Sequence, residues 1–228
     1  MDKEPVLLAI DTAQELGSVC IARGKHLLAF RSQEQQKDHA IWIHQAIEDM
    51  RIEANLSWSD IDGVTVSNGP GSYTGLRVGL STSKGISFSL NRPLITIGTL
   101  EMMAWGMKEM TSEWICPMID ARRMEVYYAI YRNDLSVVEG PSAKILQQKS
   151  FDEYLHDHQI VFAGSGSKKF QESSFSHKNA TFVNLVFDCR LLLLPSLKKF
   201  REKEFADLAY AEPLYVKEFF STMKKPLI

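Results

Sequence analysis

A pattern of strand, acid, polar loop and turn occurs twice in this chain, and it constrains the fold more than any other feature. The first copy is the apolar run with its final acid at Val6–Asp11, and a turn at Gly24 lies 13 residues after that acid. The second copy is residues 115–120, and its turn at Asn133 again lies 13 residues after the acid. Continuous apolar runs are typical of strands buried on both faces. The spacing therefore predicts two related halves.

The rest of each half continues with strands and helices. In the first half we predict strands and helices in the order βββαβαβ, with strands at residues 6–10, 18–22, 26–30, 64–67 and 94–97, and helices at 38–54 and after Thr74. In the second half we predict strands at 115–119, 125–131, 135–138 and 160–163, and helices at 151–156 and 191–205, the latter interrupted at Pro195. A duplicated βββαβαβ unit is the actin-like, or RNase H-like, α/β arrangement, with an eroded second copy.

The boundary between the halves is expected near a helix at residues 99–110, capped by Thr99. We therefore predict an N-terminal lobe of residues 1–105 and a smaller, divergent C-terminal lobe of residues 106–228.

A glycine-rich segment, Gly-Pro-Gly-Ser-Tyr-Thr-Gly-Leu-Arg-Val-Gly at residues 69–79, lies between a predicted strand and a predicted helix. Glycines allow positive φ, and the N–H groups of such a turn can converge on an anion near the positive end of the helix dipole. Hydroxyl side chains suit a helix N-terminus and could also serve a ligand. The candidate anion-binding residues here are Gly69, Gly71, Ser72 and Thr74. A tight strand-to-helix connection without a ligand is the alternative.

This segment resembles the GPGSFTGLRIG motif of the TsaB (YeaZ) family and departs from it only at Tyr73 and Val78. Three other segments are similar to family motifs in the same order: residues 7–12 with Gly17 and Ser18 resemble the first strand and loop, residues 120–127 resemble DARRGEVY, and residues 213–217 resemble P-x-Y-L-R. The region 140–205 matches poorly. The resemblance thus extends from residue 7 to residue 217.

The resemblance implies a non-catalytic subunit in the synthesis of threonylcarbamoyladenosine, the modified adenosine beside the anticodon of tRNA. It implies a TsaD-like catalytic partner, which carries the metal and transfers the threonylcarbamoyl group, and a TsaE-like ATPase in the same assembly. The chain would then meet tRNA indirectly, through the complex, and could form a homodimer when alone. The alternative function is an actin-like small-molecule kinase or ATPase.

In actin-like kinases the nucleotide lies between the lobes, held by one acid-bearing loop from each lobe. Asp11 fits the first loop. The second loop, at Asp120, contains no glycine, and its bulky side chains fill the space that a phosphate needs. Arg122 and Arg123 could bind an anion or pair with Glu125. The other candidate nucleotide-binding residues are Thr12, Gly17, Ser18, Gly164 and Gly166. We expect no tightly bound cofactor, and only weak ATP or ADP binding in a vestigial cleft.

Two histidines on the first predicted helix bear on metal binding, because TsaD carries a pair of metal-binding histidines there. His39 and His44 are five residues apart, so on a helix they point about 140° away from each other. They cannot share a metal ion, and neither begins the H-E-x-x-H motif of a zinc peptidase. We expect no metal site, and a structural role for His39.

The helix after Thr74 carries small residues at every fourth position. Glycine inside a helix costs about 1 kcal/mol relative to alanine, and close helix packing would compensate for this cost. The packing partner is either another subunit or the rest of the lobe. The preceding helix has a wide apolar arc, which favours an interface. The candidate interface residues are His39, Trp42, Ala46, Gly75, Gly79, Ser83 and Ser87.

Composition limits the partners. A formal net charge of −2 and a pI of about 6.3 do not provide the broad basic surface of a protein that binds nucleic acid alone. The N-terminal residues lack the features of a signal peptide, and no apolar run is long enough to cross a membrane. Three widely spaced cysteines are most simply buried thiols in a reducing compartment. We expect a cytoplasmic protein without membrane attachment.

Overall fold

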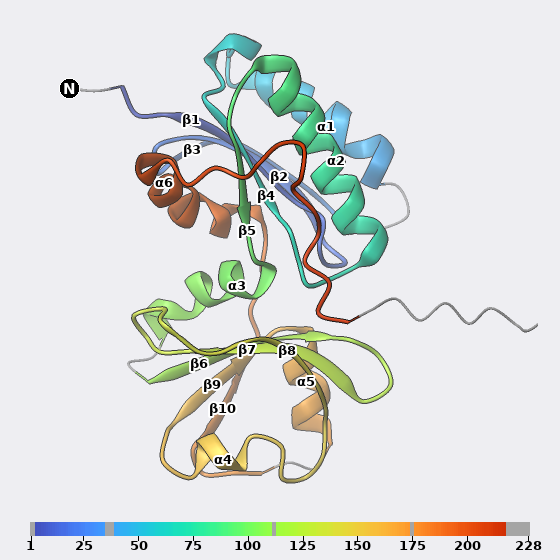
Figure 1. Ribbon diagram of the computed structural model, residues 1–228, viewed down its shortest axis with the longest axis vertical. Coiled ribbons are helices and arrows are strands. Elements are labelled where there is room, and N and C mark those ends of the chain that lie inside the picture. The colour runs from blue at the N-terminus through green and yellow to red at the C-terminus, as the bar shows by residue number, and fades with distance from the viewer. Residues whose placement is uncertain (1–2, 35–38, 111–112, 174–175, 218–228) are drawn as a thin grey trace, which may run out of the picture.

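The strands of the protein form two five-stranded sheets, which lie one above the other in Figure 1. The structure is a computed structural model, and it describes residues 3–34, 39–110, 113–173 and 176–217. The first sheet contains β1 (Val6–Asp11), β2 (Gly17–Arg23), β3 (His26–Gln33), β4 (Gly63–Ser67) and β5 (Leu94–Ile97). The second contains β6 (Trp114–Asp120), β7 (Glu125–Tyr131), β8 (Val137–Ile145), β9 (Ile160–Ala163) and β10 (Ala180–Val183).

The two sheets have the same topology. The strand order is β3-β2-β1-β4-β5 in the first sheet and, read in the same direction, β8-β7-β6-β9-β10 in the second. In each sheet the first strand of the unit pairs antiparallel with the second and parallel with the fourth. This confirms the predicted duplication. Asp11 and Asp120 consequently end corresponding central strands.

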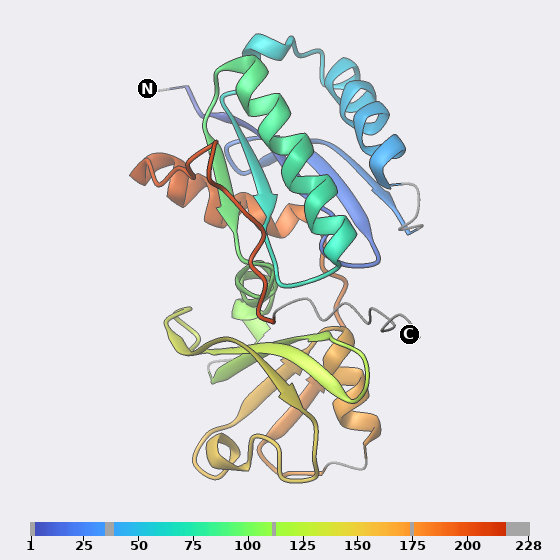
Figure 2. The ribbon, with the colours of Figure 1, turned by 45° about the vertical axis from the view of Figure 1, so that its right-hand side comes forward.

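The helices differ between the units more than the strands do. The helices are α1 (His39–Glu53), α2 (Tyr73–Leu90), α3 (Thr99–Met107), α4 (Asp152–Leu155), α5 (Ser165–Glu172) and α6 (Leu193–Glu202), with 3₁₀ turns at Trp58–Asp60, Lys108–Met110 and Cys189–Leu192. Helices α1 and α2 lie side by side on one face of the first sheet (Figure 2). Their counterparts in the second unit, α4 and α5, have 4 and 8 residues instead of 15 and 18. The predicted erosion is therefore confined to the helices.

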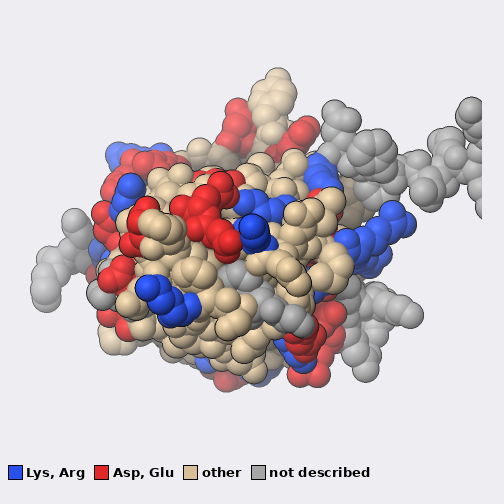
Figure 3. Space-filling model, turned by 90° about the horizontal axis from the view of Figure 1, so that it is seen from below, with Lys and Arg blue, Asp and Glu red and all other residues tan. Residues whose placement is uncertain are grey.

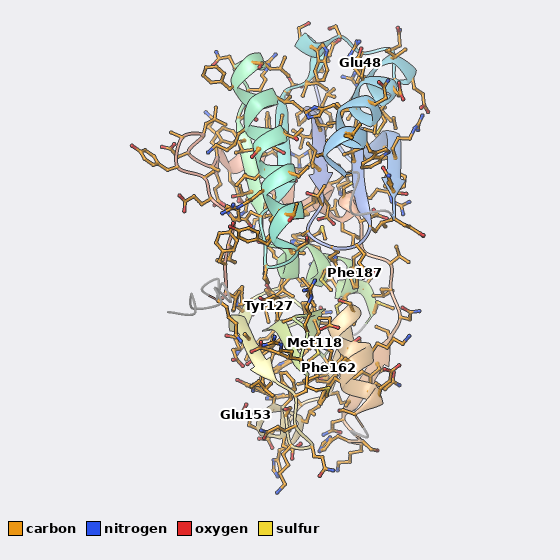
Figure 4. The ribbon with its side chains drawn as sticks, turned by 90° about the vertical axis from the view of Figure 1, so that its right-hand side faces the viewer. Glu48, Met118, Tyr127, Glu153, Phe162 and Phe187 are labelled. Atoms are coloured by element: carbon orange, nitrogen blue, oxygen red, sulfur yellow. The ribbon has the colours of Figure 1, made fainter. Side chains whose placement is uncertain are left out.

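The apolar core has three parts. One cluster fills the space between the first sheet and helices α1 and α2, and another lies inside the second unit, where Figure 4 shows Met118 and Phe162. The third cluster lies between the two sheets. It joins buried residues of β1, β5, α3 and β6 with Phe187, which Figure 4 shows at the junction of the units. The units therefore share one continuous apolar contact.

After β10 the chain returns to the first sheet. The 3₁₀ turn at Cys189–Leu192 contacts β1, β2 and β4, and α6 contacts β5. Farther along, Ala206 pairs with Leu94, and the Leu214 N–H donates to the carbonyl of Asn68 at 2.7 Å. The predicted second lobe, residues 106–228, therefore needs correction, because the chain from Cys189 onward packs against the first sheet. Local sequence gave no sign of this return, because it depends on contacts with strands more than 90 residues earlier.

Several predicted boundaries need correction. The N-cap of α3 is Gly98 rather than Thr99, and the Thr99 hydroxyl instead accepts a hydrogen bond from the Gly69 N–H at 3.1 Å. Pro195 lies in the first turn of α6, where an N–H has no helical partner to lose, so it does not interrupt the helix. Strand β8 begins at Val137 and extends to Ile145. Strand β10 and helix α5 were not predicted.

Candidate functional site

The glycine-rich turn between β4 and α2 uses its N–H groups within the protein. The Ser72 N–H donates to the carbonyl of Ala13 at 2.7 Å, and the Gly69 N–H donates to Thr99 Oγ1. The Gly75 N–H donates to the hydroxyl of Ser72, which is the N-cap of α2. These donors would have to be free to bind an anion, and they are occupied.

The first loop fills the space beside the glycine-rich turn. A side chain at Gly71 would clash with the carbonyl oxygen of Ala13, and one at Gly75 with the carbonyl oxygen of Thr12. The glycines therefore permit close packing of the chain against itself. The structure thus shows a closely packed strand-to-helix turn at Gly69, Gly71 and Ser72, and anion binding by these residues and Thr74 stays a prediction.

The other first-loop candidates also serve packing. The Thr12 hydroxyl donates to the carbonyl of Gly75 at 2.7 Å, and the Ser18 hydroxyl accepts from the Cys189 N–H at 2.9 Å. Both side chains are buried. Gly17 begins β2 and pairs with Gln33 of β3. These contacts fix the loop around Asp11.

Asp11 is fully buried at the end of β1. Its Oδ1 accepts hydrogen bonds from the Ser67 hydroxyl and the Ala13 N–H, whereas its Oδ2 has no partner in the described part of the chain. Burial raises the pKa of Asp11 to about 6; the two hydrogen bonds oppose this shift, and the charge of Asp188 adds to it. The Asp11 carboxyl therefore keeps its proton to a higher pH than a free carboxyl does, and its burial withholds it from solvent.

Asp120, the counterpart of Asp11, is held by cationic and polar partners. Its carboxylate forms an ion pair with Lys169 and accepts from the Arg122 N–H at 2.6 Å. Partial burial would raise the pKa of Asp120, but the Lys169 and Arg122 contacts outweigh it and lower the pKa. The Asp120 N–H donates to the Ser165 hydroxyl at 3.0 Å. The acid is therefore ionised and neutralised by a lysine.

The glycines near Asp120 do not form an open turn. A side chain at Gly164 would clash with the carbonyl oxygen of Met118, and one at Gly166 would lie 2.8 Å from Val126 Cγ1. They let α5 approach β6 and β7 closely. The structure brings them close to Asp120, but it gives them a packing role.

The C-terminal segment runs past the glycine-rich turn of the first unit and reaches the second unit at Lys217. Its Leu214 carbonyl oxygen lies only 2.6 Å from where a side chain would begin at Gly69. The Tyr215 hydroxyl accepts from Arg77 Nε at 3.1 Å, and Lys217 forms an ion pair with Glu125 of the second unit. Glu125 therefore pairs with Lys217 rather than with Arg122 or Arg123, the pairing that the sequence had left open.

The small-residue face of α2 packs inside the first unit. A side chain at Gly79 would clash with Thr12 Oγ1 and lie 3.4 Å from Val66. The remaining members of this face, Gly75, Ser83 and Ser87, are buried in the chain itself. This corrects their assignment to a partner interface.

On α1, Ala46 is buried, and Trp42 is half-buried and packs against the core. The side chain of His39 lies outside the described part of the chain.

A different surface of the same helices is open. Ile41 is 82% exposed and Phe88 is 78% exposed, and a groove of about 680 Å³ separates α1 from α2. The groove is lined by His44, Ile47, Trp58, Ser81, Thr82, Gly85, Ile86, Ser89 and Leu90. The sequence did contain a signal for this surface: Ile41 is an apolar residue on the side of the helix opposite the predicted core residues Ile43 and Ile47.

Within the described residues, no group of three or more His, Cys, Asp or Glu side chains is placed to hold a metal ion. In the same part of the chain, none of the helices combines the length and apolar character needed to cross a membrane.

Comparison with known proteins identifies the family. Residues 30–212 match the family model of TsaD, tRNA N6-adenosine threonylcarbamoyltransferase. The tRNA threonylcarbamoyladenosine biosynthesis protein TsaB of Haemophilus influenzae is 26% identical over 96% of this chain and 97% of its own length. TsaB of Escherichia coli is 33% identical over 56% of this chain and 55% of its own length. The chain belongs to the TsaD-related TsaB (YeaZ) family.

Solved structures of this family have the same fold. YeaZ from Pseudomonas aeruginosa has a TM-score of 0.77 and 22% identity, over 92% of this chain and 99% of that chain. A second Pseudomonas aeruginosa protein, described as similar to the peptidase YeaZ, has a TM-score of 0.81 at 22% identity, over 93% of this chain and all of its own. Together with the duplicated sheet topology, these likenesses establish the actin-like fold of this TsaB-family chain.

Proposed function

We propose that this chain is a non-catalytic subunit in tRNA threonylcarbamoyladenosine synthesis, which binds and stabilises a TsaD-like catalytic subunit. One observation carries the proposal. The residues predicted for nucleotide chemistry are used for internal packing, whereas α1 and α2 leave large apolar side chains exposed. The TsaB names of the relatives supply the pathway.

The α1–α2 surface supports an interface with another helical surface. Ile41 near the start of α1 and Phe88 near the end of α2 expose large apolar side chains, and together with the groove between the helices they offer apolar surface to a partner. The groove between the helices is bordered by Ser81, Gly85 and Ser89, and small residues let a partner helix approach closely. A TsaD-like subunit has a similar fold and would present a corresponding helix pair. The same face would allow this chain to form a homodimer when the partner is absent.

We place a TsaE-like ATPase in the complex because the resemblance implies one. Weak binding of ATP or ADP stays a prediction, and the filled glycine-rich turn argues against a tightly held phosphate.

The broad proposal is tested by depleting the protein in its host and measuring modified nucleosides of bulk tRNA by mass spectrometry. We expect threonylcarbamoyladenosine to disappear. The activity should return in vitro only when this chain and a TsaD-like subunit are both supplied. An unchanged level of the modified nucleoside would refute the proposal.

The interface is tested with Ile41→Asp and Phe88→Asp, because each adds a charge at an exposed apolar position. We expect normal folding, loss of association with the TsaD-like subunit, and loss of the modification activity. Val186→Asp is the matched control, since Val186 is 76% exposed and lies outside α1 and α2. Equal association of all three variants would show that the partner binds elsewhere.

A further inference from the structure

The hairpin that joins β6 to β7 has an unusual backbone. Arg122, Arg123 and Met124 follow one another with φ angles of 68°, 45° and 58°, in the left-handed region that L-residues rarely enter. Main-chain hydrogen bonds fix the hairpin: the Glu125 N–H donates to the Arg122 carbonyl at 2.8 Å, and the Leu146 N–H donates to the Met124 carbonyl at 2.7 Å. The two arginines are therefore presented on a rigid turn.

The nearby carboxylates are neutralised by lysines. Asp120 pairs with Lys169 from α5, and Glu125 pairs with Lys217 from the C-terminal segment. Arg122 and Arg123 are exposed, and within the described part of the chain neither guanidinium forms a hydrogen bond or an ion pair. Four cations therefore surround two carboxylates at this hairpin, on a chain whose formal net charge is −2.

An exposed guanidinium pair on a fixed backbone suits phosphate. Arginine presents its donors in a planar fork that matches phosphate oxygens, and it remains charged at any physiological pH. A rigid turn also reduces the entropy lost on binding. By contrast, Figure 3 shows Lys and Arg interspersed with Asp and Glu on the end of the second unit, so that end does not form a continuous basic surface.

We propose that Arg122 and Arg123 bind backbone phosphates of an RNA. That this RNA is the tRNA substrate rests on the proposed function. A free nucleotide would supply the same phosphate chemistry, but the hairpin tip is open to solvent, which suits the backbone of an extended RNA. The contribution is local, and the partner subunit must hold most of the RNA.

The test uses the full-length chain together with its TsaD-like subunit. A fluorescent tRNA transcript is titrated over a range of salt concentrations, and ATP is titrated in a parallel arm. For Arg122→Ala/Arg123→Ala we expect about tenfold weaker tRNA binding. The slope of log K against the logarithm of the salt concentration should also become smaller in magnitude by about 1 to 2. The control Lys25→Ala/Lys198→Ala removes the same charge from exposed positions elsewhere and should leave the salt dependence nearly unchanged.

Two further readouts separate binding from folding. All variants should keep the Tm of the parent protein, and Arg122→Lys/Arg123→Lys should restore most of the salt dependence because it restores the charge. Unchanged tRNA binding by the alanine variant would overturn the inference while leaving the modification pathway untouched. Loss of ATP binding without loss of tRNA binding would overturn it too. Arginine-dependent tRNA binding in a complex that cannot modify tRNA would instead uphold the inference and refute the proposed function.

Discussion

At the scale of single residues, Met124 shows a conflict between residue type and backbone conformation. It is the second of the two central positions of the hairpin turn, both with positive φ, an arrangement that strongly favours Asn-Gly. The motif DARRGEVY, which this segment resembles, has glycine at the corresponding position. The left-handed conformation costs a side-chain-bearing residue about 1–2 kcal/mol.

Met124→Gly should therefore stabilise the protein by about 0.5–1 kcal/mol, since the relief of strain exceeds the entropic cost of glycine. Met124 is 44% exposed, so little buried surface is lost. Chemical denaturation measures the change. Met110→Gly is the matched control, because Met110 is 47% exposed and is not among the residues with positive φ; we expect it to lose stability. Destabilisation of equal size in both variants would contradict the strain argument.

Asp11 gives a pH-dependent prediction at the same scale. Its native pKa of about 6 lies above the ordinary value of 3.8, so the native state favours the neutral acid. Its stabilising contribution is fully present below about pH 4 and is lost as the pH rises through about 6.

Asp11→Asn should gain stability relative to the parent by about 2–3 kcal/mol between pH 4 and pH 7.5, because asparagine cannot ionise. Denaturant unfolding at several pH values measures this difference. Ser67→Ala provides a comparison, since it removes a hydrogen bond to Asp11 without removing the carboxyl. A difference between Asp11→Asn and the parent that does not vary with pH would show that Asp11 is ionised throughout.

At the scale of elements, α2 illustrates how one helix serves two surfaces. Its small-residue face lies against the first loop and β4, and this close approach explains the glycine at position 79. Its opposite side carries Phe88 and borders the groove toward α1, and at Gly85 a side chain would meet no atom within 4 Å. The helix is thus positioned by its glycines and presents its other residues outward.

Gly79→Ala should destabilise the isolated chain by about 1–3 kcal/mol, because its methyl group displaces Thr12 and disturbs the Thr12 hydrogen bond to Gly75. Gly85→Ala, on the same helix, should stabilise it by about 0.5–1 kcal/mol, because alanine is the better helix former and has space. Thermal unfolding of both variants measures the contrast. Equal stability of the two would place the small-residue face outside the core.

At the scale of the whole molecule, the two units are joined by an apolar core and by the C-terminal segment. The core includes residues from both sheets and from α3, and Lys217 links the segment to Glu125. A kinase of this fold needs two acid-bearing loops that open onto a shared cleft. Here one acid is buried and the other is paired with a lysine.

The purified chain should therefore hydrolyse ATP no faster than a buffer blank with magnesium present. A coupled assay for released phosphate measures the rate, and Asp11→Asn is the control variant, which should behave identically. Steady turnover that Asp11→Asn abolishes would establish the alternative function, a small-molecule kinase or ATPase.

The sequence by itself determined the elements whose signals are local. Strands β5, β7 and β9 occupy the residues predicted for them, because a strand buried between other layers requires a continuous apolar run. The equal spacing of the acids and turns determined the duplication, since equivalent strands and hairpins need equivalent lengths of chain. The motifs from residue 7 to residue 217 determined the family.

The tertiary structure alone decided what the candidate residues do. Glycines at 71, 75 and 79 are compatible with a phosphate cradle, a partner helix or a neighbouring loop, and only the position of residues 12–13 selects the loop. The lysine that neutralises Asp120 lies 49 residues later in the sequence, on a helix that was not predicted. The return of residues 189–217 to the first sheet likewise depends on long-range burial. Such contacts depend on which surfaces meet after folding, and no local pattern of residues specifies that.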